Sequence, residues 1–144
     1  MSRKPTRVLA ALLWCAVAPA PATNIIVVTE NIDKNLDRVA DDQGLIDWLV
    51  AEGHSVDVRR NLWDHLDSKR IAELNVADLV IVSRLADSGL YIHGDETTEW
   101  NSLKTPLLLL SAYFARNGRW NWVNSAAVTE NTPEIHVETA VVKT

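Results

Sequence analysis

Polar and charged side chains directly follow the most apolar stretches of this chain, and their types suit the binding of a ligand. Ser83 and Arg84 come after the stretch LVIV, and Glu30 comes after NIIVVT. A guanidinium group binds carboxylates and other anions, and hydroxyl groups complete such sites with hydrogen bonds. The candidate ligand-binding residues are Glu30, Ser83, Arg84, Ser88, Tyr91, Tyr113, Arg116 and Trp120. No residue is assigned a catalytic role or a role as a metal ligand.

The elements that must position these side chains alternate between strands and helices. Strands are predicted at 24–29, 54–60, 78–83 and 106–111, and helices at 41–53, 66–75 and 95–104. This alternation predicts βαβ units in an α/β fold, with an open parallel sheet and helices on both of its faces. The second strand alternates apolar and polar residues, as an edge strand does, so we expect the strand order 2-1-3-4.

Acidic residues and a glycine are predicted to mark the helix ends. Asp41 or Asp42 is expected to cap the start of the first helix and Asp67 that of the second, because a carboxylate accepts hydrogen bonds from the free amides there. Gly53 is expected to end the first helix, because glycine readily adopts the left-handed conformation found at that position.

The carboxyl ends of the strands form the edge at which open α/β sheets bind ligands. We therefore expect Arg84 and Arg116 to point into one crevice, with Ser83, Ser88 and Tyr91 around it. Two guanidinium groups there would favour a carboxylate or another anionic group. The alternative is that the hydroxyl groups only cap the turns that follow the strands.

Three stretches together resemble a known family: IIVVTENIDKNLD…GLIDWLVAEGHSV, ADLVIVSRLADSGLY and TEWNSLKTPLLLLSAYFARNGRWNW. They are similar to the Rossmann-like domain of secreted bacterial proteins of unknown function, which is related to type 1 glutamine amidotransferase-like and ThuA-like folds. The resemblance covers residues 24–122 and implies a flavodoxin-like fold and an extracellular setting, but no activity. It departs at the C-terminus, where EIHVETAVVKT leaves little room for further strands, so we expect a truncated copy.

The amidotransferase relatives imply an alternative function, a divergent hydrolase acting at the strand-end crevice. Such enzymes use a cysteine nucleophile at a strand end and a histidine later in the chain. Ser83 stands at roughly the corresponding strand end, and His93 is the histidine predicted to lie near the crevice. No Gly-x-Ser-x-Gly motif surrounds Ser83, however, so the residues themselves do not support this chemistry.

Residues 1–22 have the three-part pattern of a secretory signal peptide, with basic residues, an apolar stretch and a small-residue cleavage site. The apolar stretch is too short for a permanent membrane anchor, although an uncleaved anchor is the alternative. Cleavage after Ala22 removes Cys15 and leaves 23–144 as a single domain without cysteine. It also removes three basic residues, which takes the net charge from −5 to −8. We therefore expect a secreted or periplasmic protein that has no cofactor, binds no nucleic acid and is not inserted in a membrane.

The loop 33–42 partly matches a calcium-binding pattern. Oxygen-bearing side chains stand at positions 1, 3, 5 and 9 of an EF-hand loop, namely Asp33, Asn35, Asp37 and Asp41. Arg38 replaces the turn-making glycine at position 6, and Gly44 replaces the bidentate carboxylate at position 12. A solvated loop is therefore the favoured interpretation, and a weak calcium site is the alternative.

An aromatic cluster follows the fourth predicted strand and consists of Tyr113, Phe114, Trp120 and Trp122. Exposed tryptophans stack on sugar rings, so the cluster favours a secreted, non-catalytic module that binds a glycan or a protein partner. The alternative is that these rings cover the end of a small core. We expect Trp100 to be buried and at least one of Trp120 and Trp122 to be exposed, and we expect Trp120→Ala to weaken binding but not stability.

Overall fold

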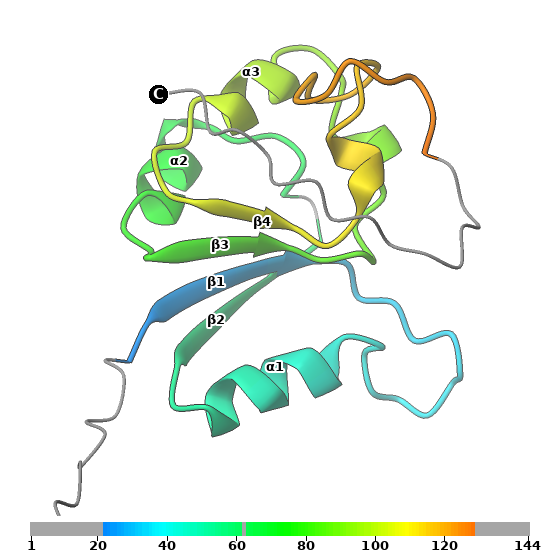
Figure 1. Ribbon diagram of the computed structural model, residues 1–144. Coiled ribbons are helices and arrows are strands. Elements are labelled where there is room, and N and C mark those ends of the chain that lie inside the picture. Colours follow the sequence, from blue (N-terminus) through cyan, green and yellow to red (C-terminus); the bar gives the residue numbers. More distant parts are fainter. Residues whose placement is uncertain (1–21, 62, 129–144) are drawn as a thin grey trace, which may run out of the picture.

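One four-stranded, all-parallel sheet organises residues 22–61 and 63–128, which are the residues that this computed structural model describes (Figure 1). The strands are β1 (Asn24–Thr29), β2 (Ser55–Arg60), β3 (Leu79–Val82) and β4 (Leu107–Leu109). Their order is β2-β1-β3-β4, which confirms the predicted order. The almost wholly buried β1 lies inside the sheet, and the half-exposed β2 lies at its edge.

Short helical segments connect the strands. They are α1 (Gln43–Ala51), α2 (Ser68–Leu74), the 3₁₀ turn η1 (Ser88–Leu90), α3 (Glu96–Asn101) and the 3₁₀ turn η2 (Ala112–Phe114). The three predicted α-helices are present, but α3 ends before the predicted residue 104.

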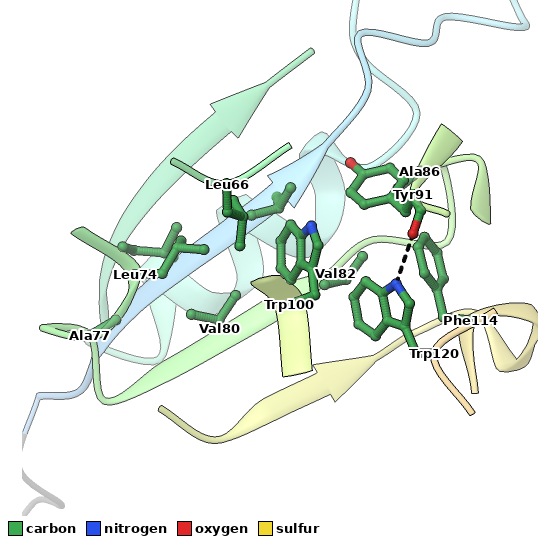
Figure 2. Packing of buried hydrophobic residues seen from close by; sticks show 12 residues of the cluster. Leu66, Leu74, Ala77, Val80, Val82, Ala86, Tyr91, Trp100, Phe114 and Trp120 are labelled. Atoms are coloured by element: carbon green, nitrogen blue, oxygen red, sulfur yellow. Dashed lines mark hydrogen bonds between the residues drawn. The ribbon is translucent and has the colours of Figure 1, made fainter. Parts of the chain in front are cut away.

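Apolar side chains pack on both faces of the sheet, with α1 on one side and α2 and α3 on the other (Figure 1). Neighbouring residues of a strand point to opposite faces, so β1 contributes to both layers. Ile25 and Val27 pack with Leu49 of α1. The larger cluster, on the face of α2 and α3, comprises Ile26, Val28, Leu66, Leu74, Ala77, Val80, Val82, Ala86, Tyr91, Trp100, Phe114 and Trp120 (Figure 2).

The helix ends confirm two of the predicted caps and correct the third. The Asp67 carboxylate accepts a hydrogen bond from the Arg70 amide at 2.8 Å, and Gly53 follows α1 with a φ of 92°. Asp42 occupies the N-cap position of α1, but its side chain makes no capping hydrogen bond. Its carboxylate instead accepts a hydrogen bond from Thr29 Oγ1 and pairs with the Arg60 guanidinium at 3.3 Å. The Asp42 carboxylate therefore binds the Thr29 hydroxyl and the Arg60 guanidinium instead of the backbone amides at the start of α1.

Two predictions concern parts of the chain outside the described residues. The predicted signal peptide covers 1–22, of which only Ala22 is described, and the stretch EIHVETAVVKT lies entirely beyond residue 128. Among the helices of 22–61 and 63–128, none combines the length and the apolar character that crossing a membrane requires.

Candidate functional site

The carboxyl ends of β1 and β3 lie side by side at one edge of the sheet. The Ser83 amide donates to the Val28 carbonyl at 2.9 Å, which carries the pairing of the two strands one residue beyond β3. The connections from these strands run to opposite faces, since α1, which follows β1, covers one face and α3, which follows β3, covers the other. Glu30 and Arg84 therefore emerge where the two connections diverge, which is the position at which open α/β sheets bind ligands.

The Ser83 side chain stabilises the turn that follows β3. It is 1% exposed, and its Oγ accepts a hydrogen bond from the Leu85 amide at 3.2 Å. This is the capping role that the sequence left open as the alternative to ligand binding. Arg84, the next residue, is exposed to solvent.

Tyr91 lies at the centre of the aromatic packing beneath this edge. Its ring centroid is 5.6 Å from that of Trp100, 5.2 Å from that of Phe114 and 6.4 Å from that of Trp120. The residue is fully buried, yet among the described residues its hydroxyl has no hydrogen-bond partner. Figure 2 shows the hydroxyl at the end of the ring that points away from Trp120.

Acidic side chains surround the end of β1. Burial raises the pKa of Glu30 above its ordinary value, and the charges of Asp64 and Asp87 raise it further. Burial also raises the pKa of Tyr91, and the next largest contributions come from Glu30, Asp64 and Glu96. The charges that raise these two pKa values are therefore acidic, and they are not the two arginines that the sequence suggested for this edge.

The remaining predicted ligand-binding residues have contacts within the chain. Ser88 is buried, and its Oγ accepts a hydrogen bond from Arg119 Nε at 3.4 Å. The guanidinium carbon of Arg116 lies 5.3 Å from the ring centroid of Tyr113, and its buried Nε has no hydrogen-bond partner among the described residues. No pocket is found in the described part of the chain, so a ligand at this edge would bind at the surface.

Trp120 is a core residue, which corrects its assignment as an exposed ligand-binding side chain. It is 1% exposed, and its Nε1 donates to the Tyr91 carbonyl at 3.2 Å (Figure 2). Trp100 is 0% exposed and Trp122 is 44% exposed, so both of those expectations are confirmed. The two later tryptophans do not share a face because Asn121 between them has a φ of 60°, which turns the backbone.

The contacts of Ser83 and His93 give no support to a hydrolytic pair. The His93 side chain belongs to an exposed residue, and its backbone amide donates to Glu96 Oε2 at 2.7 Å. In residues 22–61 and 63–128, Ser83 Oγ has no hydrogen bond to a histidine. Within these residues, no histidine is hydrogen-bonded to the hydroxyl as an activating base would be.

The acidic loop 33–42 uses its carboxylates to hold its own backbone. Asp33 accepts hydrogen bonds from the amides of Asp37 and Arg38, and Asp37 accepts one from the Val39 amide at 2.8 Å. Asp41 accepts one from the Lys34 amide. The described residues contain no group of three acidic, histidine or cysteine side chains arranged to hold a metal ion. These contacts favour the interpretation as a solvated loop.

Sequence reasoning missed the acids whose charges raise the pKa values of Glu30 and Tyr91. Asp64, Asp87 and Glu96 are far apart along the chain, and no motif joins them. Asp87 and Glu96 each carry a local signal: the Asp87 side chain accepts a hydrogen bond from the Gly89 amide at 2.8 Å and caps η1, and the Glu96 side chain accepts one from the His93 amide at 2.7 Å. The fold is needed to place Asp64.

Comparison with known proteins gives no match for this chain. No protein-family model, no curated protein and no solved structure matches it. The function is therefore inferred from the chain's own residues.

Proposed function

We propose that this chain is a secreted, non-catalytic module that binds a glycan through the surface around Trp122. One observation carries the proposal: the indole of Trp122 is exposed but held in a fixed orientation. Its Nε1 donates to Asn101 Oδ1 at 2.7 Å, and its ring packs 5.7 Å from that of buried Trp120. A ring that is already ordered loses little entropy when a ligand stacks on it.

The backbone around Trp122 is also well supported. The amides of Trp122 and Val123 both donate to the Ala115 carbonyl at 2.9 Å, which joins this segment to the end of η2. Val123 is 49% exposed, and Tyr113 on η2 is 37% exposed. Together they extend the apolar surface beside the tryptophan ring.

Exposed asparagines favour a glycan as the occupant of this surface. Asn117, Asn121 and Asn124 all lie in the segment that carries Trp122, and all three are exposed. Amide groups both donate and accept hydrogen bonds, as the hydroxyls of a sugar do. A sugar ring stacked on Trp122 would thus find polar partners at its rim.

The finer class of fold and the cellular setting belong to the same proposal. The all-parallel order β2-β1-β3-β4 is compatible with a flavodoxin-like fold of the amidotransferase-like or ThuA-like kind. The basic and apolar pattern of residues 1–22 supports export. The hydrolase alternative has no supporting contact at Ser83, as described above.

A glycan array probed with the labelled protein tests this function, followed by calorimetry with the strongest ligand. Trp122→Ala should abolish most of the binding while the protein stays folded, because 44% of the Trp122 residue is exposed and the core beneath it is left intact. Trp48→Ala is the matched control, since Trp48 is 56% exposed on α1, on the opposite face of the sheet. The proposal fails if no glycan binds above background, or if Trp48→Ala weakens binding as much as Trp122→Ala does.

A further inference from the structure

An asparagine and a glycine stand next to each other in an exposed turn after η2. Asn117 and Gly118 occupy the centre of this turn, because the Arg119 amide donates to the Arg116 carbonyl at 3.0 Å. Both central residues are exposed. Asn117 is the only asparagine of the chain that is followed by glycine. Asn-Gly pairs are common in turns, and this pair also brings together two groups that can react with each other.

The two groups are the side-chain carboxamide of Asn117 and the backbone nitrogen of Gly118. The nitrogen directly follows Asn117 in the chain, so its attack on Cγ closes a small ring without bringing distant parts of the molecule together. Among the described residues, no hydrogen bond occupies the Asn117 carboxamide or the Gly118 N–H. Neither group must therefore give up a partner before the reaction.

Gly118 also leaves the attacking nitrogen unhindered. A Cβ placed on Gly118 would meet no heavy atom within 4 Å, and the φ of Gly118 lies outside the left-handed region. The backbone conformation therefore does not require glycine at this position. The absence of a side chain nevertheless removes the steric hindrance that any other residue would place beside the nitrogen.

We propose that Asn117 is a site of self-modification, at which the Gly118 nitrogen displaces ammonia from the Asn117 carboxamide. A bond forms between this nitrogen and Cγ as the bond between Cγ and Nδ2 breaks, and the ammonia carries away the proton of the Gly118 amide. Water then opens the cyclic imide. Opening at the Cγ carbonyl gives aspartate. Opening at the backbone carbonyl gives isoaspartate, in which the main chain runs through Cβ and Cγ.

The isoaspartate product alters the loop that carries Trp122. It adds a methylene group to the main chain between the Arg116 carbonyl and the Arg119 amide, which are hydrogen-bonded in the unmodified turn. The same carbonyl accepts a hydrogen bond from the Asn121 amide at 3.1 Å. The modification therefore weakens the contacts that close this loop, and we expect the isoaspartate form to have a lower melting temperature. The aspartate form keeps the main chain unchanged.

Ageing of the purified full chain tests the proposal without any measurement of glycan binding. Samples are kept at mildly acidic and mildly alkaline pH and are then digested for mass spectrometry. A carboxyl methyltransferase specific for isoaspartate measures that product. We expect conversion at Asn117, faster at alkaline pH because the attacking nitrogen must lose its proton. Asn124 is the internal control, since it is also exposed but is followed by Ser125. It should convert more slowly by about tenfold.

Two variants separate the chemistry from structural effects. Gly118→Ala fits the open space at this position and should slow the conversion by about tenfold, because the methyl group hinders the attack. Asn117→Asp has the charge of the aspartate product and should keep the melting temperature of the unmodified protein. The aged sample that contains isoaspartate should melt at a lower temperature than this variant does.

Three outcomes would overturn the proposal. The first is conversion at Asn117 that is no faster than conversion at Asn124 in the same sample. The second is conversion of Gly118→Ala at the rate of the unchanged chain. The third is conversion in urea-unfolded protein alone, which would show that the folded turn prevents the attack.

Discussion

The indole rings of Trp100 and Trp120 are stacked, with centroids 5.1 Å apart and planes inclined by 18°. Trp100 belongs to α3, and Trp120 follows η2, so the contact joins two segments on the same face of the sheet. Asn101 supports it from the side, because its Nδ2 donates to the Trp120 carbonyl at 3.1 Å. This pair closes the larger of the two apolar layers at the end nearest the candidate site.

Replacing either ring by alanine should therefore destabilise the protein strongly. We expect Trp120→Ala and Trp100→Ala each to lower the free energy of unfolding by about 3–5 kcal/mol, as truncation of a large buried side chain does. Trp122→Ala should cost about 1 kcal/mol or less, because that side chain is 44% exposed. Urea unfolding of the three variants measures this. A loss at Trp120 no larger than that at Trp122 would contradict the packing described here.

The ion pair between Arg60 and Asp42 is expected to stabilise the junction of β1, β2 and α1. The Asp42 side chain is 4% exposed and that of Arg60 is 26% exposed. Arg60→Ala leaves a buried carboxylate with only Thr29 as a partner, and we expect a loss of about 1–3 kcal/mol after allowing for solvent screening. Lys69→Ala on the exposed side of α2 is the control and should change the stability little. Equal losses in denaturant unfolding would show that Asp42 does not need its guanidinium partner.

Stability should depend on pH through Glu30. Its native pKa is raised above the ordinary value of 4.5, so the native state binds the proton more tightly than the unfolded state does. Its ionisation therefore destabilises the fold at neutral pH, and this cost disappears as the pH falls through the raised pKa. Glu30→Gln should stabilise the protein at about pH 7 and lose that advantage near pH 4. Thermal unfolding at both pH values checks this. A stability gain of Glu30→Gln that becomes larger as the pH is lowered would contradict this prediction.

Two glycines at the ends of α1 should respond to alanine in opposite ways. Gly53 has a φ of 92°, and a side chain there is strained although the space around it is open. We expect Gly53→Ala to destabilise by about 1–2 kcal/mol. Gly44 lies inside α1 with equally open surroundings, and Gly44→Ala should stabilise by about 0.5–1 kcal/mol. Parallel urea titrations give both values, and the same sign for both variants would refute the backbone argument.

The sequence predicts the sheet well because burial and strand order are set by patterns that are local. The apolar run of β1 and the alternation of β2 place the first inside the sheet and the second at its edge, as observed. The buried state of Trp100 follows in the same way from its place on a helix that covers the sheet.

The site was predicted less well because it depends on contacts between distant loops. The position of Trp120 is decided by the left-handed backbone of Asn121, which no periodicity indicates. The acids whose charges raise the pKa of Tyr91 include Glu30 and Asp64, which come from different connections. Strand-end chemistry identified Glu30 and Tyr91, but not Asp64 or Glu96, whose charges also raise the pKa of Tyr91.

The all-parallel sheet also sets how this chain can reach its native state. No two neighbouring strands are joined by a hairpin, and even the central pairing joins Ile25 to Leu79 across much of the chain. Each pairing must therefore close a long loop before it gains any stabilising contact, which makes folding slow. During synthesis β1 emerges first and can pair with β2, but its second partner β3 follows only after more than half of the described chain has been made.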